Sequence, residues 1–86
     1  MSKQWFVYVL KSLKDGGYYI GYTSNLQKRL DYHNSGRQRS TRHRTPFVLV
    51  YYEVFSSKSE AIKREKQLKS YKGGNALKRL LENRGA

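Results

Sequence analysis

The sequence contains no cysteine among its 86 residues. It can therefore form neither a disulfide nor a thiolate metal site, and it has no thiol-based redox centre. Such a composition suits a reducing compartment, and we expect a soluble cytoplasmic protein. The longest apolar run near the N-terminus, residues 5–10, is too short for a signal peptide or a membrane span. We therefore expect no association with membranes.

Acidic residues are also scarce, since 6 Asp and Glu stand against 18 Lys and Arg, which gives a formal net charge of +12. Such an excess concentrates polyanions near the protein, and nucleic acid is the partner that it favours. We expect binding to weaken steeply with salt, because each neutralised phosphate releases counterions. A small RNA-associated protein of the ribosomal type would have the same composition, so charge alone says nothing about catalysis.

The short chain and its pattern of apolar residues predict one α+β domain over residues 1–86. Strands are expected at residues 4–11, 17–22 and 47–55, and helices at 24–35, 58–70 and 75–83. The first strand is apolar on both faces, which is typical of a central strand. The expected fold is a small, mainly antiparallel three-stranded sheet flanked by three helices. No apolar stripe is left over, so we expect a monomer.

The segment after the first hairpin turn combines a strand glycine with a helix start. Gly21 interrupts the second strand, which indicates a bulge or a point where a group such as a phosphate approaches the backbone. Ser24 and Gln27 fit a capping box that opens the helix, and Gly36 is expected to close it. Arg29 and His33 are four residues apart, so they should project from one face. An ordinary solvated helix surface would carry the same pair.

Residues 37–44 contain four arginines and no apolar side chain. A segment of this kind cannot bury anything, so it is expected to be a surface loop that is mobile until an anion orders it. Guanidinium groups pair with phosphates in a bidentate manner, which favours phosphate contact over a merely solubilising role. The residues concerned are Arg37, Arg39, Arg42 and Arg44.

Glu65 lies within the apolar face of the second predicted helix, between Ala61 and Leu68. A buried carboxylate needs compensation by an arginine, by hydrogen bonds or by a metal ion. A structural ion pair with Arg29 is the simplest of these possibilities. Glu53 is expected at a strand end or another exposed position, and we do not regard it as a ligand.

Five features occur in an order and spacing that together resemble the GIY-YIG nuclease superfamily, specifically its small stand-alone members. They are Phe6-Val7-Tyr8, Tyr19-Ile20-Gly21 with Thr23, Arg29, His33 and Glu65. The resemblance covers residues 5–81. The first motif departs from the family pattern, because Phe6 replaces the name-giving glycine and Val7 replaces isoleucine. Its tyrosine, Tyr8, is retained.

The resemblance implies phosphodiester hydrolysis with one divalent cation, Mg²⁺ or Mn²⁺, held by Glu65. Magnesium keeps several waters, so a single protein carboxylate is chemically sufficient. Arg29 would neutralise the scissile phosphate. Tyr8 would take a proton from the attacking water, which requires Arg29 and the metal to lower its pKa. Tyr19 would position phosphate or water.

Further residues complete the predicted site. His33 would either assist proton transfer or hold the phosphate. The predicted substrate-binding residues are Gly21, Thr23, Arg37, Arg39, Arg42, Arg44 and Lys72. The expected substrate is DNA, cut with low sequence specificity, and activity can depend on a protein partner, because relatives with clear targets carry an extra recognition domain. The alternative is a non-catalytic, basic nucleic-acid-binding module that retains the nuclease scaffold.

Overall fold

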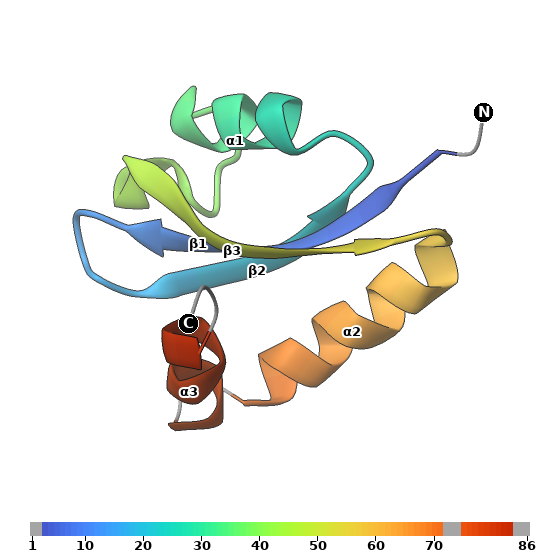
Figure 1. The fold of residues 1–86 in the computed structure, drawn as a ribbon. Coiled ribbons are helices and arrows are strands. Elements are labelled where there is room, and N and C mark those ends of the chain that lie inside the picture. Colours follow the sequence, from blue (N-terminus) through green and yellow to red (C-terminus); the bar gives the residue numbers. More distant parts are fainter. Residues whose placement is uncertain (1–2, 72–74, 84–86) are drawn as a thin grey trace.

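The computed structural model describes residues 3–71 and 75–83, which form a three-stranded sheet with helices on both faces (Figure 1). Three strands, three α-helices and one short 3-10 helix follow one another along these residues: β1 (Trp5–Ser12), β2 (Tyr18–Thr23), α1 (Leu26–Asn34), η1 (Arg42–Arg44), β3 (Phe47–Phe55), α2 (Lys58–Ser70) and α3 (Asn75–Asn83). The predicted α+β class is confirmed. Across the described ranges, none of the helices combines the length and the apolar character needed to cross a membrane.

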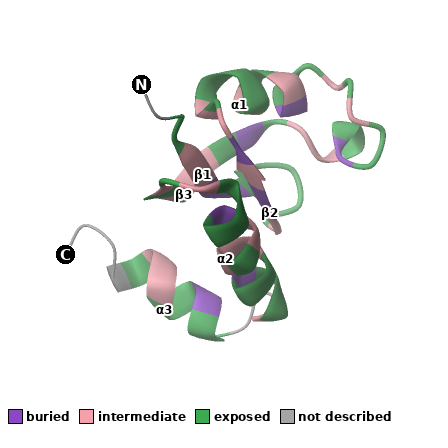
Figure 2. Ribbon diagram, turned by 90° about the vertical axis from the view of Figure 1, so that its right-hand side faces the viewer, coloured by how far each residue is buried: buried purple, intermediate pink, exposed green. Residues whose placement is uncertain are grey.

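The sheet has the order β2-β1-β3, and both neighbouring pairs are antiparallel. β1 is therefore the central strand, as its two apolar faces predicted. Val7 and Val9 are fully buried on the side covered by α2 and α3, whereas Tyr8 and Leu10 are buried on the side of α1. Figure 2 shows this burial concentrated along the sheet and on the helix surfaces that face it. β2 is left as a free edge.

The hairpin register places the two motif tyrosines on one face. Tyr8 pairs with Gly21, and Leu10 pairs with Tyr19, so Tyr8 and Tyr19 are diagonal neighbours. This pairing runs through Gly21 without interruption, and the one register shift lies at Val9/Leu10 in the pairing with β3. The possibility of a bulge at Gly21 is thus wrong.

The start of α1 differs from the predicted capping box. Asn25 is the N-cap, and its side chain accepts a hydrogen bond of 3.0 Å from the N–H of Lys28. The Thr23 hydroxyl accepts the N–H of Asn25 at 3.1 Å, which fixes the chain one residue beyond Ser24. At the other end, Gly36 follows the helix with φ +78°, as its sequence position predicted.

The α2 helix begins and ends as expected, and its cap is Ser57, whose hydroxyl accepts the N–H of Glu60. It is joined to β3 by a bidentate ion pair, with Arg64 Nε 2.8 Å from Glu53 Oε1 and Arg64 Nη2 2.9 Å from Oε2. The Tyr51 hydroxyl donates to the same carboxylate. The prediction of an exposed Glu53 is therefore wrong, because α2 covers this position and supplies its partner.

Candidate active site

A pocket of about 450 Å³ lies over the free edge of β2 and gathers side chains from both faces of the sheet. Arg29 reaches it from α1, and Glu65 reaches it from α2, the helix on the opposite face. Six of the residues predicted from sequence line this pocket: Tyr8, Tyr19, Gly21, Thr23, Arg29 and Glu65. The edge strand thus lets two helices that the sheet separates contribute to one site.

Arg29 is exposed on α1, with its guanidinium carbon 5.6 Å from the centre of the Tyr32 ring. Within residues 3–71 and 75–83 no ion pair involves this side chain. The predicted structural pair with Glu65 is not formed. The guanidinium can therefore offer its charge to a phosphate in the pocket.

Glu65 is mostly buried but still accessible, since 13% of its side chain is exposed. Its carboxylate lies 3.5 Å from the ammonium nitrogen of Lys69, one turn further along α2. The described residues contain no group of three or more His, Asp or Glu arranged to hold a metal. A cation here would have one carboxylate ligand, and water or phosphate oxygens would complete its shell. That donor set fits Mg²⁺.

Tyr8 and His33 form a buried pair beneath the pocket. The Tyr8 hydroxyl lies 3.2 Å from His33 Nε2, and His33 Nδ1 lies 3.4 Å from the Thr41 hydroxyl. His33 is fully buried, and its ring packs edge-on against Tyr19 at 4.7 Å between centroids. The prediction that Arg29 and His33 project together is wrong, because the end of α1 carrying His33 is pressed onto the aromatic face of the sheet.

Burial governs the acid–base properties of this pair. It raises the pKa of Tyr8 above its ordinary value, Tyr19 and Glu65 add to the rise, and Arg29 opposes it only in part. The expected lowering by Arg29 therefore does not prevail. Burial, followed by the charge of Arg29, lowers the pKa of His33. A neutral imidazole protonated on Nδ1 can donate to Thr41 and accept the Tyr8 proton on Nε2.

Gly21 makes room for the tyrosine hydroxyl. A Cβ atom at this position would lie 2.5 Å from Tyr8 Oη and 2.8 Å from Cζ. The group that approaches the strand backbone is thus a side chain of the protein itself. Thr23 is also buried and lines the pocket, and its hydroxyl is hydrogen-bonded to the Asn25 backbone.

The basic loop makes more contacts with the rest of the domain than predicted. Thr41 is buried and contacts His33, and the Gln38 amide donates to the Tyr19 hydroxyl at 3.4 Å. The prediction that residues 37–44 bury nothing is therefore wrong. A polar loop gives no sequence signal for these two contacts, since they depend on where α1 and β3 bring the loop.

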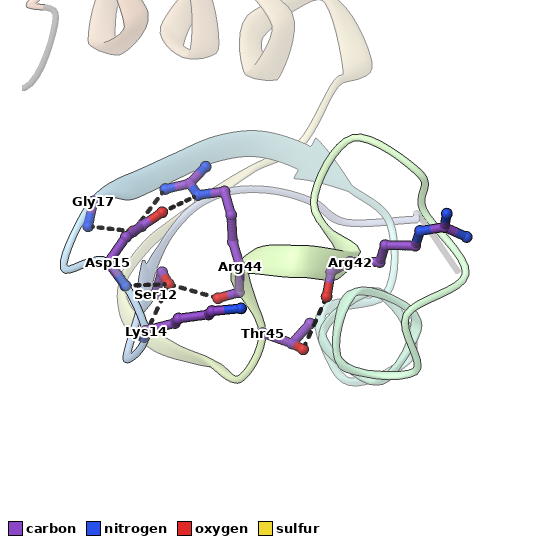
Figure 3. Close-up of polar contacts among 7 residues, drawn as sticks. All are labelled: Ser12, Lys14, Asp15, Gly17, Arg42, Arg44 and Thr45. Carbon is purple, nitrogen blue, oxygen red and sulfur yellow. Dashed lines mark hydrogen bonds and ion pairs between the residues drawn. The ribbon is translucent and has the colours of Figure 1, made fainter.

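The loop arginines divide into two groups. Arg44 pairs with Asp15 at 2.7 Å, and this hydrogen-bonded guanidinium lowers the pKa of Asp15 to about 2. Figure 3 shows Arg44 reaching this turn, while Arg42 points away from it. Arg37, Arg39 and Arg42 are exposed and do not line the Glu65 pocket. Lys72, the remaining predicted contact, lies outside the described residues.

Four further residues line the pocket and were not predicted as site residues: Trp5, Tyr22, Ser24 and Lys58. One of them had a usable signal, because Lys58 precedes Glu65 by seven residues and so shares its face of α2. Trp5 and Tyr22 lie on neighbouring strands, and their position at the pocket depends on the hairpin register.

Comparison with known proteins gives a consistent family assignment. A family model described as "GIY-YIG catalytic domain" matches residues 4–78. A UPF0213 protein of Staphylococcus haemolyticus is 45% identical over 78 residues, covering 90% of this chain and 94% of the relative. A UPF0213 protein of Streptococcus pneumoniae is 43% identical over 84 residues, with coverages of 96% and 84%.

A solved structure is also similar in sequence. The solution NMR structure of a UPF0213 protein from Bacillus halodurans is 38% identical and covers 86% of this chain and 90% of that protein, with a TM-score of 0.43.

Proposed function

Because the chain belongs to the GIY-YIG nuclease family, we propose that it is a metal-dependent endonuclease that hydrolyses phosphodiester bonds, with DNA as its substrate and low intrinsic sequence specificity. The observation that supports this proposal is the pocket over β2, where an unpaired guanidinium and a carboxylate face one space from opposite helices. We further propose that residues 1–86 act as a single nuclease domain.

Arg29 and Glu65 bind the two charged partners of the reaction in this proposal. The Arg29 guanidinium holds the scissile phosphate and stabilises the charge that develops on its oxygens. Glu65 would hold one Mg²⁺ or Mn²⁺, which when bound supplies Lewis-acid stabilisation of the phosphate oxygens. The Lys69 ammonium is 55% exposed, so it could turn into solvent and free the Glu65 carboxylate for a cation.

Tyr8 and His33 carry the proton. A tyrosine whose pKa is raised by burial is a poor base alone, so its hydroxyl proton must leave as it accepts one from water. His33 Nε2, 3.2 Å away and neutral, is positioned to accept it. This assigns His33 to proton transfer, because a fully buried ring cannot contact a phosphate in the pocket. Tyr19 orients phosphate or water, held by Gln38.

The second candidate function is a binding module without catalysis. The net charge of +12 and the exposed arginines of residues 37–42 support binding equally well. The contact of Glu65 with Lys69 also gives the carboxylate a partner that needs no metal. In either case a partner protein can supply targeting.

Cleavage assays distinguish the two functions. Labelled single-stranded, duplex and branched DNA, and RNA, are incubated at low salt with Mg²⁺ or Mn²⁺ and with wild type, Glu65→Ala or Arg29→Ala. Glu60→Ala is the matched control, because this exposed carboxylate of α2 does not line the pocket. Cleavage by wild type and Glu60→Ala alone supports the nuclease. Equal binding by all four proteins without metal-dependent products supports the binding module.

A further inference from the structure

The pocket has an aromatic wall that phosphate hydrolysis does not require. Trp5, at the start of β1, and Tyr22, near the end of β2, both line it on the side of α2. Their ring centroids are 6.2 Å apart with a tilt of 47°. Both residues are only partly buried, so part of this wall can contact a ligand.

Two lysines gather at the same indole. Lys3 Nζ and Lys58 Nζ each lie 5.5 Å from the centre of the Trp5 ring. Both lysines are exposed, and within the described part of the chain neither belongs to an ion pair. Neither ammonium group has a counter-charge among the described residues. An anion carried next to a stacking group would supply one.

The wall is close to the proposed chemistry. Lys58 and Glu65 are two turns apart on one face of α2, and both line the pocket with Trp5. Arg29 enters the same pocket from the opposite helix. A strand whose scissile phosphate contacts Arg29 would therefore carry a neighbouring base toward the indole.

Single-stranded nucleic acid is commonly held by aromatic side chains that stack with bases and by cations that contact the backbone. We propose that Trp5 and Tyr22 form a stacking site for the nucleobase adjacent to the scissile phosphate, with Lys58 binding the neighbouring phosphate. This rests on the proposed function for the class of ligand, but it requires binding only and not cleavage.

The protein contains one tryptophan, so Trp5 fluorescence reports on the site directly. A single-stranded DNA hexamer and an abasic hexamer with the same number of phosphates are titrated into the full chain at low salt with chelator. We expect saturable quenching by the hexamer with bases, little quenching by the abasic one, and affinity for the abasic strand about tenfold or more weaker. Equal quenching and equal affinity would overturn the proposal.

Substitutions separate stacking from packing. Trp5→Phe should retain the preference for the strand with bases, whereas Trp5→Leu should lose it while binding the abasic strand as wild type does, both followed by anisotropy of labelled DNA. Circular dichroism checks that Trp5→Leu is folded. If it is not, the comparison of the two hexamers is made with wild type and Trp5→Phe, and it still tests the proposal. A preference for bases that is unchanged in Trp5→Leu would show that the indole only packs against the core.

The lysine has a matched control on its own helix. Lys58→Ala should make the fall of log affinity for the single-stranded hexamer with log salt less steep by about 0.7. Lys63→Ala, an exposed lysine outside the pocket, should change it less. Equal effects would remove Lys58 from the proposed site.

The two proposals fail in different ways. Absence of cleavage by wild type together with base-dependent quenching would reject the nuclease and keep the stacking site. Cleavage by wild type without any difference between the two hexamers would support the nuclease and reject the stacking site.

Discussion

Tyr8 depends on the absence of a side chain opposite it. A methyl group at position 21 would lie 2.5 Å from a hydroxyl that is almost completely buried and bonded to His33. We expect Gly21→Ala to displace the ring, to lower the free energy of unfolding by about 1–3 kcal/mol and to reduce cleavage. Urea unfolding checks the first effect. The loss of unfolding free energy caused by Gly21→Ala should be smaller in a Tyr8→Phe background. An equal loss in that background would exclude a clash with the hydroxyl as the cause.

His33 makes stability depend on pH. Its pKa is lowered by burial from 6.5, so between pH 6.5 and the folded value the unfolded chain takes up a proton that the folded chain does not. The stability that the neutral His33 contributes is therefore fully present above pH 6.5, and it is lost progressively as the pH falls below that value. We expect the melting temperature of wild type to drop between pH 7.5 and 5, and that of His33→Gln to drop less.

The Asp15 carboxylate does not obscure this window. The pKa of Asp15 is about 2, so the stability that it contributes is lost only at much lower pH. If the melting temperatures of wild type and His33→Gln fall equally between pH 7.5 and 5, the imidazole does not titrate as its burial requires.

At the residue scale, the family resemblance finds some site residues, whereas helical spacing alone misplaces His33. The family resemblance named Arg29 and Glu65, and both side chains do reach one pocket. The burial of His33 could not be predicted, because it depends on how α1 sits on the sheet. The role of Gly21 depends on the hairpin register, which loop length left open.

At the scale of elements, the Glu53–Arg64 pair connects β3 to α2. Burial would raise the pKa of Glu53, but hydrogen bonds from Arg64 and Tyr51 hold it below its ordinary value. Both partners are about one-fifth exposed. We expect Arg64→Met to lower the free energy of unfolding by about 1–2 kcal/mol, less than for a fully buried pair, because a mostly buried carboxylate loses its partner but keeps some contact with water. Urea unfolding at pH 7 measures this.

The double variant is the control for that prediction. Glu53→Gln combined with Arg64→Met removes the unpaired charge, so it should be more stable than Arg64→Met alone. A double variant no more stable than the single one would mean that Arg64 acts through packing of its aliphatic stem.

The elements themselves were largely readable from the sequence, since α2 and β3 have the predicted bounds. The errors occur where local hydrogen bonds compete. Thr23 and Asn25 take over the cap predicted for Ser24. The loop of residues 37–44 contributes Thr41 to the core through a contact made by tertiary packing alone.

At the scale of the whole molecule, the edge position of β2 explains how a three-stranded sheet builds a two-sided site. Helices on opposite faces can meet only where no further strand separates them. The chain order alone does not reveal this edge, because β3 could have paired with β2, but the two apolar faces of β1 did predict β1 as the central strand. The order β2-β1-β3 is set by tertiary pairing and leaves β2 open for Arg29 and Glu65.

The basic loop should contribute more to nucleic-acid binding than the net charge of the protein does. Replacing Arg37, Arg39 and Arg42 together by alanine should lower the slope of log affinity for duplex DNA against log salt by up to about 2.7, since each phosphate contact contributes about 0.9. Melting should change little, because all three side chains are exposed. Fluorescence anisotropy over a salt series measures the slope.

Three exposed lysines of α2 and α3 provide the matched control: Lys63, Lys66 and Lys78. Their triple alanine variant has the same net charge as the arginine variant but leaves the loop intact. We expect it to keep most of the wild-type slope, because α2 and α3 lie on the face of the sheet opposite to α1. Equal losses in the two triple variants would mean that DNA responds to total charge, and the loop would then have no part in directing the strand toward Arg29.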